Sequence, residues 1–179
     1  MIGVLVSGEG TNLQALIDER LPVACVASNR GGVRALGRAE AAGLPTAVFE
    51  EDDYPDRGAR DEAMATWLEQ HGVSLVVCAG YMHLLRPPFL ERFPGRVVNT
   101  HSAPLPEFPG PYPIDDVLAA GVTETAATVH YVDGGVDTGP VIAAERVPVL
   151  PTDDADSLRA RVQRVEHRLL PRVVRSLIS

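Results

Sequence analysis

The chain has 179 residues, of which 45% are hydrophobic and 22% charged, a composition typical of a globular protein of one domain. Its 16 Lys and Arg residues against 24 Asp and Glu residues give a formal net charge of -8, the wrong sign for a protein that neutralises nucleic-acid phosphates. No apolar run approaches the ~20 residues of a membrane helix, and the start lacks the basic segment of a secretion signal. We therefore expect a cytoplasmic protein that binds neither nucleic acid nor a membrane.

Five short runs rich in β-branched residues are almost continuously apolar, as strands are when both faces of a parallel sheet are covered. They are Ile2–Ser7, Pro22–Ser28, Pro45–Glu50, Ser74–Gly80 and Arg96–Asn99. Amphipathic helical stretches follow the first four, at Asn12–Glu19, Val33–Ala42, Arg57–His71 and Pro88–Arg92. The alternation predicts an α/β fold with a doubly wound, mostly parallel, Rossmann-like sheet.

The pattern changes in the last third of the chain. Thr123–Val132 and Pro140–Val149 look like strands and are separated by too few residues for a parallel crossover, so we expect an antiparallel C-terminal hairpin. A final helix should run from about Asp154 to Ile178, because acidic and hydroxyl residues at its start suit an N-cap.

Ligands of open α/β sheets bind beyond the carboxyl ends of the strands, and the first unusual segment there is SGEGTN, from Ser7 to Asn12. Its glycines and the N-terminus of the following helix suit an anion, and the side chains of Thr11 and Asn12 add donors. The segment is neither a full dinucleotide fingerprint nor a P-loop. It is either a loop for a single phosphate or a tight structural turn.

A second unusual segment joins the end of a strand to a proline-rich loop, in NTHSAPLP. Residues two apart on an extended chain point the same way, so Asn99 and His101 can donate hydrogen bonds to one oxygen, as an oxyanion hole does. The later turn VDGGVDTGP carries Asp133 and Asp137. Aspartate is an ordinary turn residue, but either carboxylate could pair with His101 and favour its protonated form.

The loop AGYMHLLRPPF after the fourth predicted strand is rich in apolar side chains. Met82, Leu84 and Leu85 could line a flat apolar pocket, or they could belong to the core. The residues alone favour the core.

Six segments, taken in order, resemble the glycinamide ribonucleotide formyltransferases, a folate-dependent family of purine synthesis. They are SGEGTNLQALI, ASNR, AGYMHLLRPPF, VVNTHSAPLPEFPG, VHYVDGGVDTGPVI and RVQRVEHRLLP. The match runs with few gaps from Ile2 to about Pro171. The order and spacing of Asn99, His101 and Asp137 make it more specific than any single motif.

The resemblance implies one formyltransferase domain over residues 1–179, with a nucleotide-binding half at 1–100 and a folate and catalytic half at 101–179. The residues that match the catalytic groups of the family are Asn99, His101 and Asp137. Those that match its substrate contacts are Gly10, Thr11, Asn12, Arg57, Gln163 and Glu166. Those that match its folate contacts are Met82, His83, Leu84, Leu85 and Val136. The family uses no metal.

The reaction implied is the attack of the amine of glycinamide ribonucleotide on the formyl carbon of 10-formyltetrahydrofolate, its co-substrate. Asn99 and a protonated His101 would stabilise the negative charge on the formyl oxygen, and Asp137 would relay the proton of the amine. The partners expected are these two small molecules, with the chain as a monomer or a homodimer.

Several positions depart from the family pattern. Ser102–Pro106 differs from the usual Pro-Ser-Leu-Leu-Pro, and His83 stands where an arginine commonly follows the methionine. Thr138 replaces a glycine beside Asp137, and PYPIDD replaces a stretch that usually carries histidine. No catalytic group is lost, so we expect any difference to concern the folate contacts.

Other proteins with the same trio remain alternatives. A methionyl-tRNA formyltransferase is expected to carry a further C-terminal domain and a basic surface, and a formyltetrahydrofolate deformylase an N-terminal regulatory domain. A sugar-nucleotide formyltransferase and a catalytically silent nucleotide- or folate-binding relative are further alternatives. The loop GEGTN suits a terminal monophosphate and favours glycinamide ribonucleotide.

Overall fold

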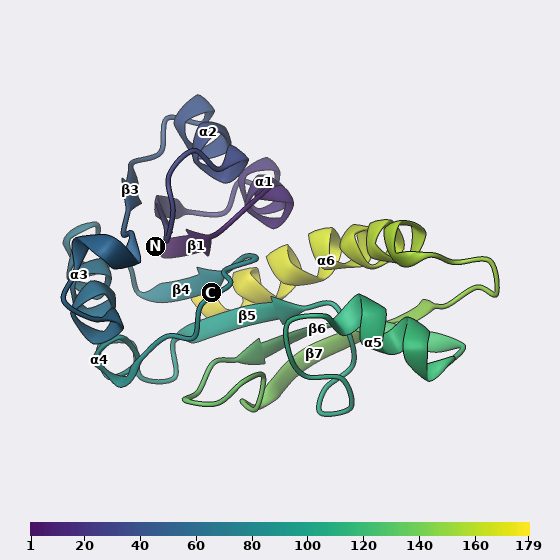
Figure 1. Cartoon of the computed structure of the whole chain (residues 1–179). Coiled ribbons are helices and arrows are strands. Elements are labelled where there is room, and N and C mark those ends of the chain that lie inside the picture. Colours follow the sequence, from purple (N-terminus) through teal and green to yellow (C-terminus); the bar gives the residue numbers. More distant parts are fainter.

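The structure is a computed structural model that describes residues 1–179. A seven-stranded sheet in the order β3-β2-β1-β4-β5-β6-β7 runs through the molecule (Figure 1). The strands are β1 (Ile2–Val6), β2 (Val23–Ser28), β3 (Thr46–Val48), β4 (Leu75–Cys78), β5 (Val97–His101), β6 (Glu124–Tyr131) and β7 (Val141–Pro148). The helices are α1 (Thr11–Asp18), α2 (Arg34–Ala41), α3 (Arg57–Gln70), α4 (Pro87–Leu90), α5 (Pro113–Ala120) and α6 (Ala155–Ile178), with a short 3-10 helix η1 (Glu51–Asp53).

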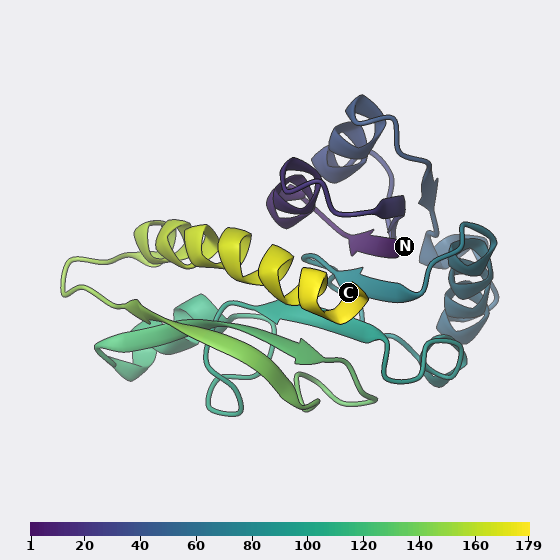
Figure 2. The same cartoon turned by 180° about the vertical axis from the view of Figure 1, so that it is seen from behind.

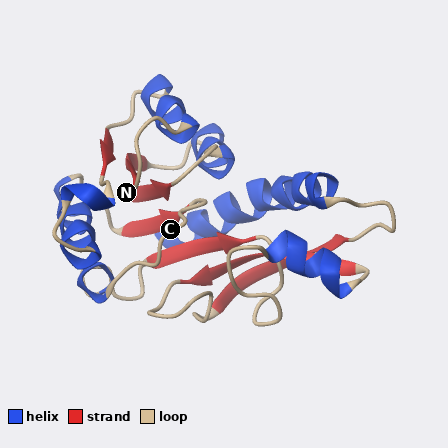
Figure 3. Cartoon of the chain, in the orientation of Figure 1, coloured by secondary structure: helices blue, strands red, loops and turns tan.

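The sheet is mixed, as the sequence predicts. Strands β3, β2, β1, β4 and β5 pair in parallel, while β6 and β7 continue the sheet antiparallel (Figure 3). The winding of the chain reverses between β1 and β4, which are neighbours in the sheet. The loops that follow these two strands therefore lie at the switch point where α/β sheets bind ligands.

Each face of the sheet carries its own hydrophobic core, so neighbouring residues of an inner strand pack in opposite directions. Val4 and Val77 belong to the cluster covered by α1, α2, α5 and α6, whereas Leu5 and Val76 belong to the cluster under α3 and α4. Figure 2 shows α6 lying along the face of the sheet that carries Val4 and Val77. Covering both faces explains why these strands are apolar along their whole length.

Two parts of the fold differ in how well the sequence predicts them. Helix α6 begins as expected, because Asp154 is its N-cap and forms a capping box with Ser157. Helix α5 is a correction, since no element was expected between Gly110 and Thr123. Strand β5 also runs to His101, past its predicted end at Asn99.

None of the helices combines the length and the apolarity that crossing a membrane requires.

Candidate active site

Two adjoining cavities open at the carboxyl ends of β1, β4 and β5. The larger, of about 540 Å³, is lined by the loop after β4, the start of α5 and the turn between β6 and β7. The smaller, of about 220 Å³, is lined by the loop between β1 and α1 and by two side chains of α6. The residues that line both are Gly80, Thr100, Ser102 and Gln163. A ligand in one cavity would therefore lie next to a ligand in the other.

The loop before α1 forms the floor of the smaller cavity, which Gly10, Thr11 and Asn12 line. Gly10 is the N-cap of α1 and has a left-handed conformation, with φ 72. A β-carbon at this position would lie 2.6 Å from the Cβ of Ala35, so the close approach of α2 also requires a glycine. No side chain caps α1, which leaves the first backbone amides of the helix available to an anion.

A buried carboxylate forms the opposite wall of the smaller cavity. Glu166 is 3% exposed; its Oε2 accepts a hydrogen bond from Asn12 Nδ2 at 3.0 Å and its Oε1 accepts one from Ser102 Oγ at 2.5 Å. Two oxygens beside it, Asn12 Oδ1 and Thr100 Oγ1, are buried without a hydrogen-bond partner. Because buried polar atoms are normally paired, this wall suits a ligand that carries N–H or O–H groups.

The side chain of His101 lies in the wall of the larger cavity and is 6% exposed. Its Nε2 lies 2.6 Å from the carbonyl oxygen of Phe108, and its Nδ1 lies 3.6 Å from Asp137 Oδ2. Both oxygens can only accept hydrogen bonds. Nε2 therefore donates to the carbonyl of Phe108, whereas Nδ1 lies beyond hydrogen-bond distance of Asp137.

Asp137 has a left-handed backbone conformation, with φ 52, which is uncommon outside glycine. Its Oδ2 accepts a hydrogen bond from the amide of Gly110 at 2.9 Å, and its Oδ1 lies 3.4 Å from His130 Nε2. Burial opposes the ionisation of this carboxyl group, but the contacts with His130 and Gly110 and the charge of His101 outweigh it and lower the pKa of Asp137. Asp137 is therefore an anion at neutral pH.

The other carboxylate of the turn, Asp133, does not approach His101. Its Oδ1 accepts hydrogen bonds from the amide of Gly135 at 2.9 Å and from the hydroxyl of Thr138 at 2.6 Å. These contacts lower the pKa of Asp133, with Thr138 contributing most. The sequence leaves open which of the two carboxylates pairs with His101, and Asp137 is the one that lies beside it. Thr138 instead stabilises the turn through its hydrogen bond to Asp133.

Sequence reasoning misses a fourth side chain of this cluster, His130, which is 2% exposed. It lies opposite Asn99 in the register of β5 and β6, and its Nε2 is 3.2 Å from Asn99 Nδ2. The Nδ1 of His130 donates to the carbonyl of Tyr131 at 2.8 Å, and its Nε2 lies between Asn99 Nδ2 and Asp137 Oδ1. His130 therefore lies between the amide of Asn99 and the carboxylate of Asp137. No group of three or more His, Cys, Asp or Glu side chains is arranged to hold a metal ion.

The loop after β4 has two faces. Met82 and Leu84 are 63% and 43% exposed and line the larger cavity with Val136, whereas Leu85 also lines this cavity but is only 5% exposed and packs in the core under α3. The expectation that the apolar residues of this loop are core is therefore wrong for Met82 and Leu84 and confirmed for Leu85. His83 also lines the cavity, but its ring nitrogens contact other protein groups.

Two further residues that the resemblance assigns to the substrate, Gln163 and Arg57, lie in different places. Gln163 lines both cavities, one turn before Glu166 on α6. Arg57 lines neither cavity, and its Nε donates to Glu51 at 2.9 Å. A contact between Arg57 and a substrate remains a prediction.

Residues 1–174 match the model of the Formyl transferase family. The chain belongs to this family. The phosphoribosylglycinamide formyltransferase of Mycobacterium tuberculosis (strain ATCC 25618 / H37Rv) is 44% identical over 181 residues, which cover 98% of this chain and 84% of that protein. The crystal structure of the phosphoribosylglycinamide formyltransferase from Streptococcus pneumoniae TIGR4 matches this formyl transferase with a TM-score of 0.96 and 41% identity, over 99% of this chain and 98% of that one.

A third relative is a much longer protein. The trifunctional purine biosynthetic protein adenosine-3 of Drosophila pseudoobscura pseudoobscura is 41% identical over 186 residues, and the match covers 99% of this formyl transferase but spans only 14% of the length of that relative. The family resemblance read from the sequence and the predicted fold class are thus both confirmed.

Proposed function

We propose that this chain is a phosphoribosylglycinamide formyltransferase, which transfers the formyl group of 10-formyltetrahydrofolate to the amine of glycinamide ribonucleotide in purine biosynthesis. One observation carries the proposal. The cluster of Asn99, His101 and Asp137 lines an apolar cavity that adjoins a polar cavity suited to an anion. A reaction that transfers a formyl group from a folate to a nucleotide needs two adjoining sites around one set of proton-transfer groups.

The smaller cavity suits glycinamide ribonucleotide. Its phosphate would bind the uncapped N-terminus of α1 at Gly10, Thr11 and Asn12, where the helix dipole favours an anion. The ribose hydroxyls and the amine would donate to Asn12 Oδ1 and to Glu166, whose carboxylate has lone pairs left beyond its two protein contacts. Gln163 would contact the same end of the nucleotide.

The larger cavity suits the folate. Its volume of about 540 Å³ lies within the ~300–1,000 Å³ of small-molecule sites, and Met82, Leu84 and Val136 give it an apolar wall for the ring. The bound donor supplies the formyl group. In this proposal residues 1–100 contribute most of the nucleotide site and residues 101–179 most of the catalytic site of one domain.

Asn99 and His101 stabilise the negative charge that develops on the formyl oxygen when the amine attacks. Asn99 has a second amide hydrogen beyond the one directed at His130, and His101 Nε2 becomes available when it leaves the carbonyl of Phe108. Each oxyanion donor is worth ~10²- to 10³-fold in rate. Asp137 takes the proton that the amine loses and returns one to the folate nitrogen, directly or through water, which contributes ~10²- to 10⁴-fold.

The test follows the loss of 10-formyltetrahydrofolate with purified protein and one of three acceptors, which are glycinamide ribonucleotide, an amino sugar nucleotide and water. Rapid turnover with glycinamide ribonucleotide alone supports the proposal. Preference for the amino sugar nucleotide, equal loss in water, or no loss with any acceptor would each overturn it. The assignment to the cytoplasm and the state as monomer or homodimer remain predictions.

A further inference from the structure

The loop after β4, residues 81–86, is attached to the protein on one side only. Met82 and Leu84 face the larger cavity, whereas the alternate residues Tyr81, His83 and Leu85 are less exposed. The rings of Tyr81 and His83 pack edge to face at 6.1 Å, and Leu85 lies in the core under α3. What holds the inner side of this loop therefore decides where its apolar outer side lies.

The ring of His83 contacts a buried cation through one nitrogen. Its Nδ1 lies 2.6 Å from Nη1 of Arg60, which is 0% exposed. A guanidinium can only donate hydrogen bonds, so Nδ1 must carry a lone pair and the proton of a neutral ring must be on Nε2. Burial lowers the pKa of His83, and so do the charges of Arg60 and Arg57, while Glu51 and Asp61 oppose this shift.

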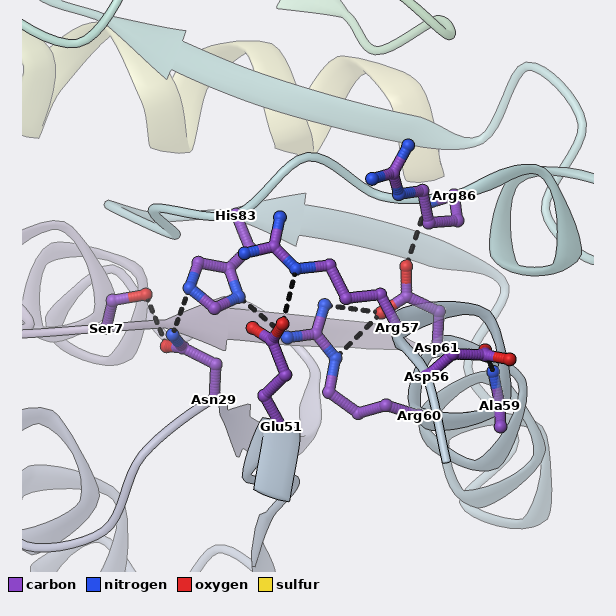
Figure 4. A network of polar contacts seen from close by, with 10 residues as sticks. All are labelled: Ser7, Asn29, Glu51, Asp56, Arg57, Ala59, Arg60, Asp61, His83 and Arg86. Atoms are coloured by element: carbon purple, nitrogen blue, oxygen red, sulfur yellow. Dashed lines mark hydrogen bonds and ion pairs between the residues drawn. The ribbon is translucent and has the colours of Figure 1, made fainter. Parts of the chain in front are cut away.

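The other nitrogen connects the ring to the loop that follows β1. His83 Nε2 lies 3.2 Å from the side-chain amide of Asn29, and the other end of that amide lies 2.6 Å from Ser7 Oγ. Here Asn29 Nδ2 faces Nε2, and Asn29 Oδ1 accepts from Ser7 Oγ. Two donors therefore flank the ring, and a neutral ring can accept from only one of them. Rotating the Asn29 amide by about 180° turns its oxygen toward the proton on Nε2 and its nitrogen toward Ser7. Ser7 Oγ in turn accepts from the backbone amide of Met82 at 2.9 Å. Figure 4 shows His83 between Asn29 and Arg60.

The far end of the same loop is held by the residue next to Arg60. Asp61 is also 0% exposed; its Oδ1 accepts from Nε and Nη2 of Arg60 at 3.0 and 2.6 Å, and its Oδ2 accepts from the backbone amide of Arg86 at 2.7 Å. A buried ion pair is stabilising only when its remaining polar atoms are satisfied. Here the loop satisfies them. His83 accepts from Nη1, the guanidinium nitrogen of Arg60 that Asp61 does not contact, and the amide of Arg86 donates to Oδ2, the carboxylate oxygen that Arg60 does not contact.

We propose that His83 is a positioning residue, a neutral imidazole that joins α3 to the Asn29 and Ser7 side chains and so holds Met82 and Leu84 against the folate. The consequence for catalysis rests on the proposed function, whereas the hydrogen bonds themselves do not. His83 touches no reacting atom. Its loss should therefore weaken binding of the folate and leave the chemical step nearly unchanged.

Kinetics of matched variants test this role. His83→Ala should raise the KM for 10-formyltetrahydrofolate about tenfold, the effect of losing a hydrogen bond to a charged group, with kcat within about twofold. His83→Asn keeps an acceptor near the position of Nδ1 and should recover most of the loss. His71→Ala is the control, because His71 follows the other end of α3 and its Nδ1 contacts only the carbonyl of Trp67. An unchanged KM, or a fall in kcat alone, would overturn the proposal.

Two measurements decide the proposal even for a protein that does not turn over these substrates. Side-chain ¹⁵N NMR near pH 7 should show His83 with a proton on Nε2 and none on Nδ1; the opposite tautomer or a doubly protonated ring would contradict it. Hydrogen exchange of the Met82 amide should be slow in the parent protein and His71→Ala and faster in His83→Ala. Equal exchange in all three would refute the positioning role, whatever the acceptor of the enzyme is.

Discussion

Replacing Gly10 with alanine should destabilise the protein in two separable ways. Alanine at φ 72 adopts a left-handed conformation, which costs ~1–2 kcal/mol. The new Cβ would also lie 2.6 Å from the Cβ and 2.7 Å from the Cα of Ala35, and such overpacking typically costs ~1–3 kcal/mol. Together these effects lower the free energy of unfolding by about 2–5 kcal/mol.

Gly43→Ala is the matched control for the backbone term. Gly43 has φ +71, close to the value at Gly10, but no heavy atom lies within 4 Å of its Cβ position. Only the conformational term of ~1–2 kcal/mol then applies. Because 1 kcal/mol shifts the unfolding temperature of a chain of this size by ~2–4 °C, Gly10→Ala should unfold about 2–12 °C below Gly43→Ala.

Thermal unfolding followed by circular dichroism measures both variants against the parent protein. Gly10→Ala should also lose affinity for glycinamide ribonucleotide, because the loop must move away from α2 to accept the methyl group. Unfolding temperatures of the two variants that agree within a degree would refute the reasoning, since they would show that α2 retreats without a packing penalty.

Asp137→Asn should lower kcat by ~10²- to 10⁴-fold. The unfolding temperature should change little, because asparagine tolerates the left-handed conformation. A nearly normal rate would show that Asp137 does not relay the proton. Asn99→Ala should lower kcat by ~10²- to 10³-fold, measured at saturating substrates, and an undiminished rate would exclude it as an oxyanion donor. Burial lowers the pKa of His167, and burial with the neighbouring arginines lowers that of His83, below the ordinary value of 6.5. The unfolded imidazoles of these two residues therefore bind protons near pH 6.5 that the folded ones do not, so their contribution to the free energy of unfolding should decrease as the pH falls from 7.5 to 5.5. Thermal unfolding at both pH values should show a smaller decrease for the double variant His83→Asn, His167→Gln.

The sequence predicts best what depends on local patterns. The inner strands are apolar because both faces of the sheet are covered, and α6 begins at Asp154 because that side chain accepts from the Ser157 amide. The sequence of α5 also contains local helix signals. Pro113 stands in its first turn, Asp115 and Asp116 follow, and Gly121 ends it with φ 66.

Contacts between distant segments are the part that local patterns do not contain. An Arg-Asp pair in an amphipathic helix normally faces solvent, so nothing in the α3 sequence reveals that Arg60 and Asp61 are buried. The sequence likewise gives no sign that His130 belongs to the site, because only the register of β5 and β6 places it opposite Asn99. The conformation of the turn between β6 and β7 places Asp137 rather than Asp133 beside His101, a choice that the turn sequence alone leaves open.

The hydrogen bond between Asn12 and Glu166 joins side chains 154 positions apart. The loop before α1 precedes α6 in the chain, so it leaves the ribosome before that helix does. Domains generally fold as units, and here the wall that Glu166 provides for the smaller cavity is missing until α6 has been synthesised. A nascent chain that lacks this helix therefore has the loop before α1 but not the complete smaller cavity. Under the proposed function, such a chain should not bind glycinamide ribonucleotide as the finished protein does.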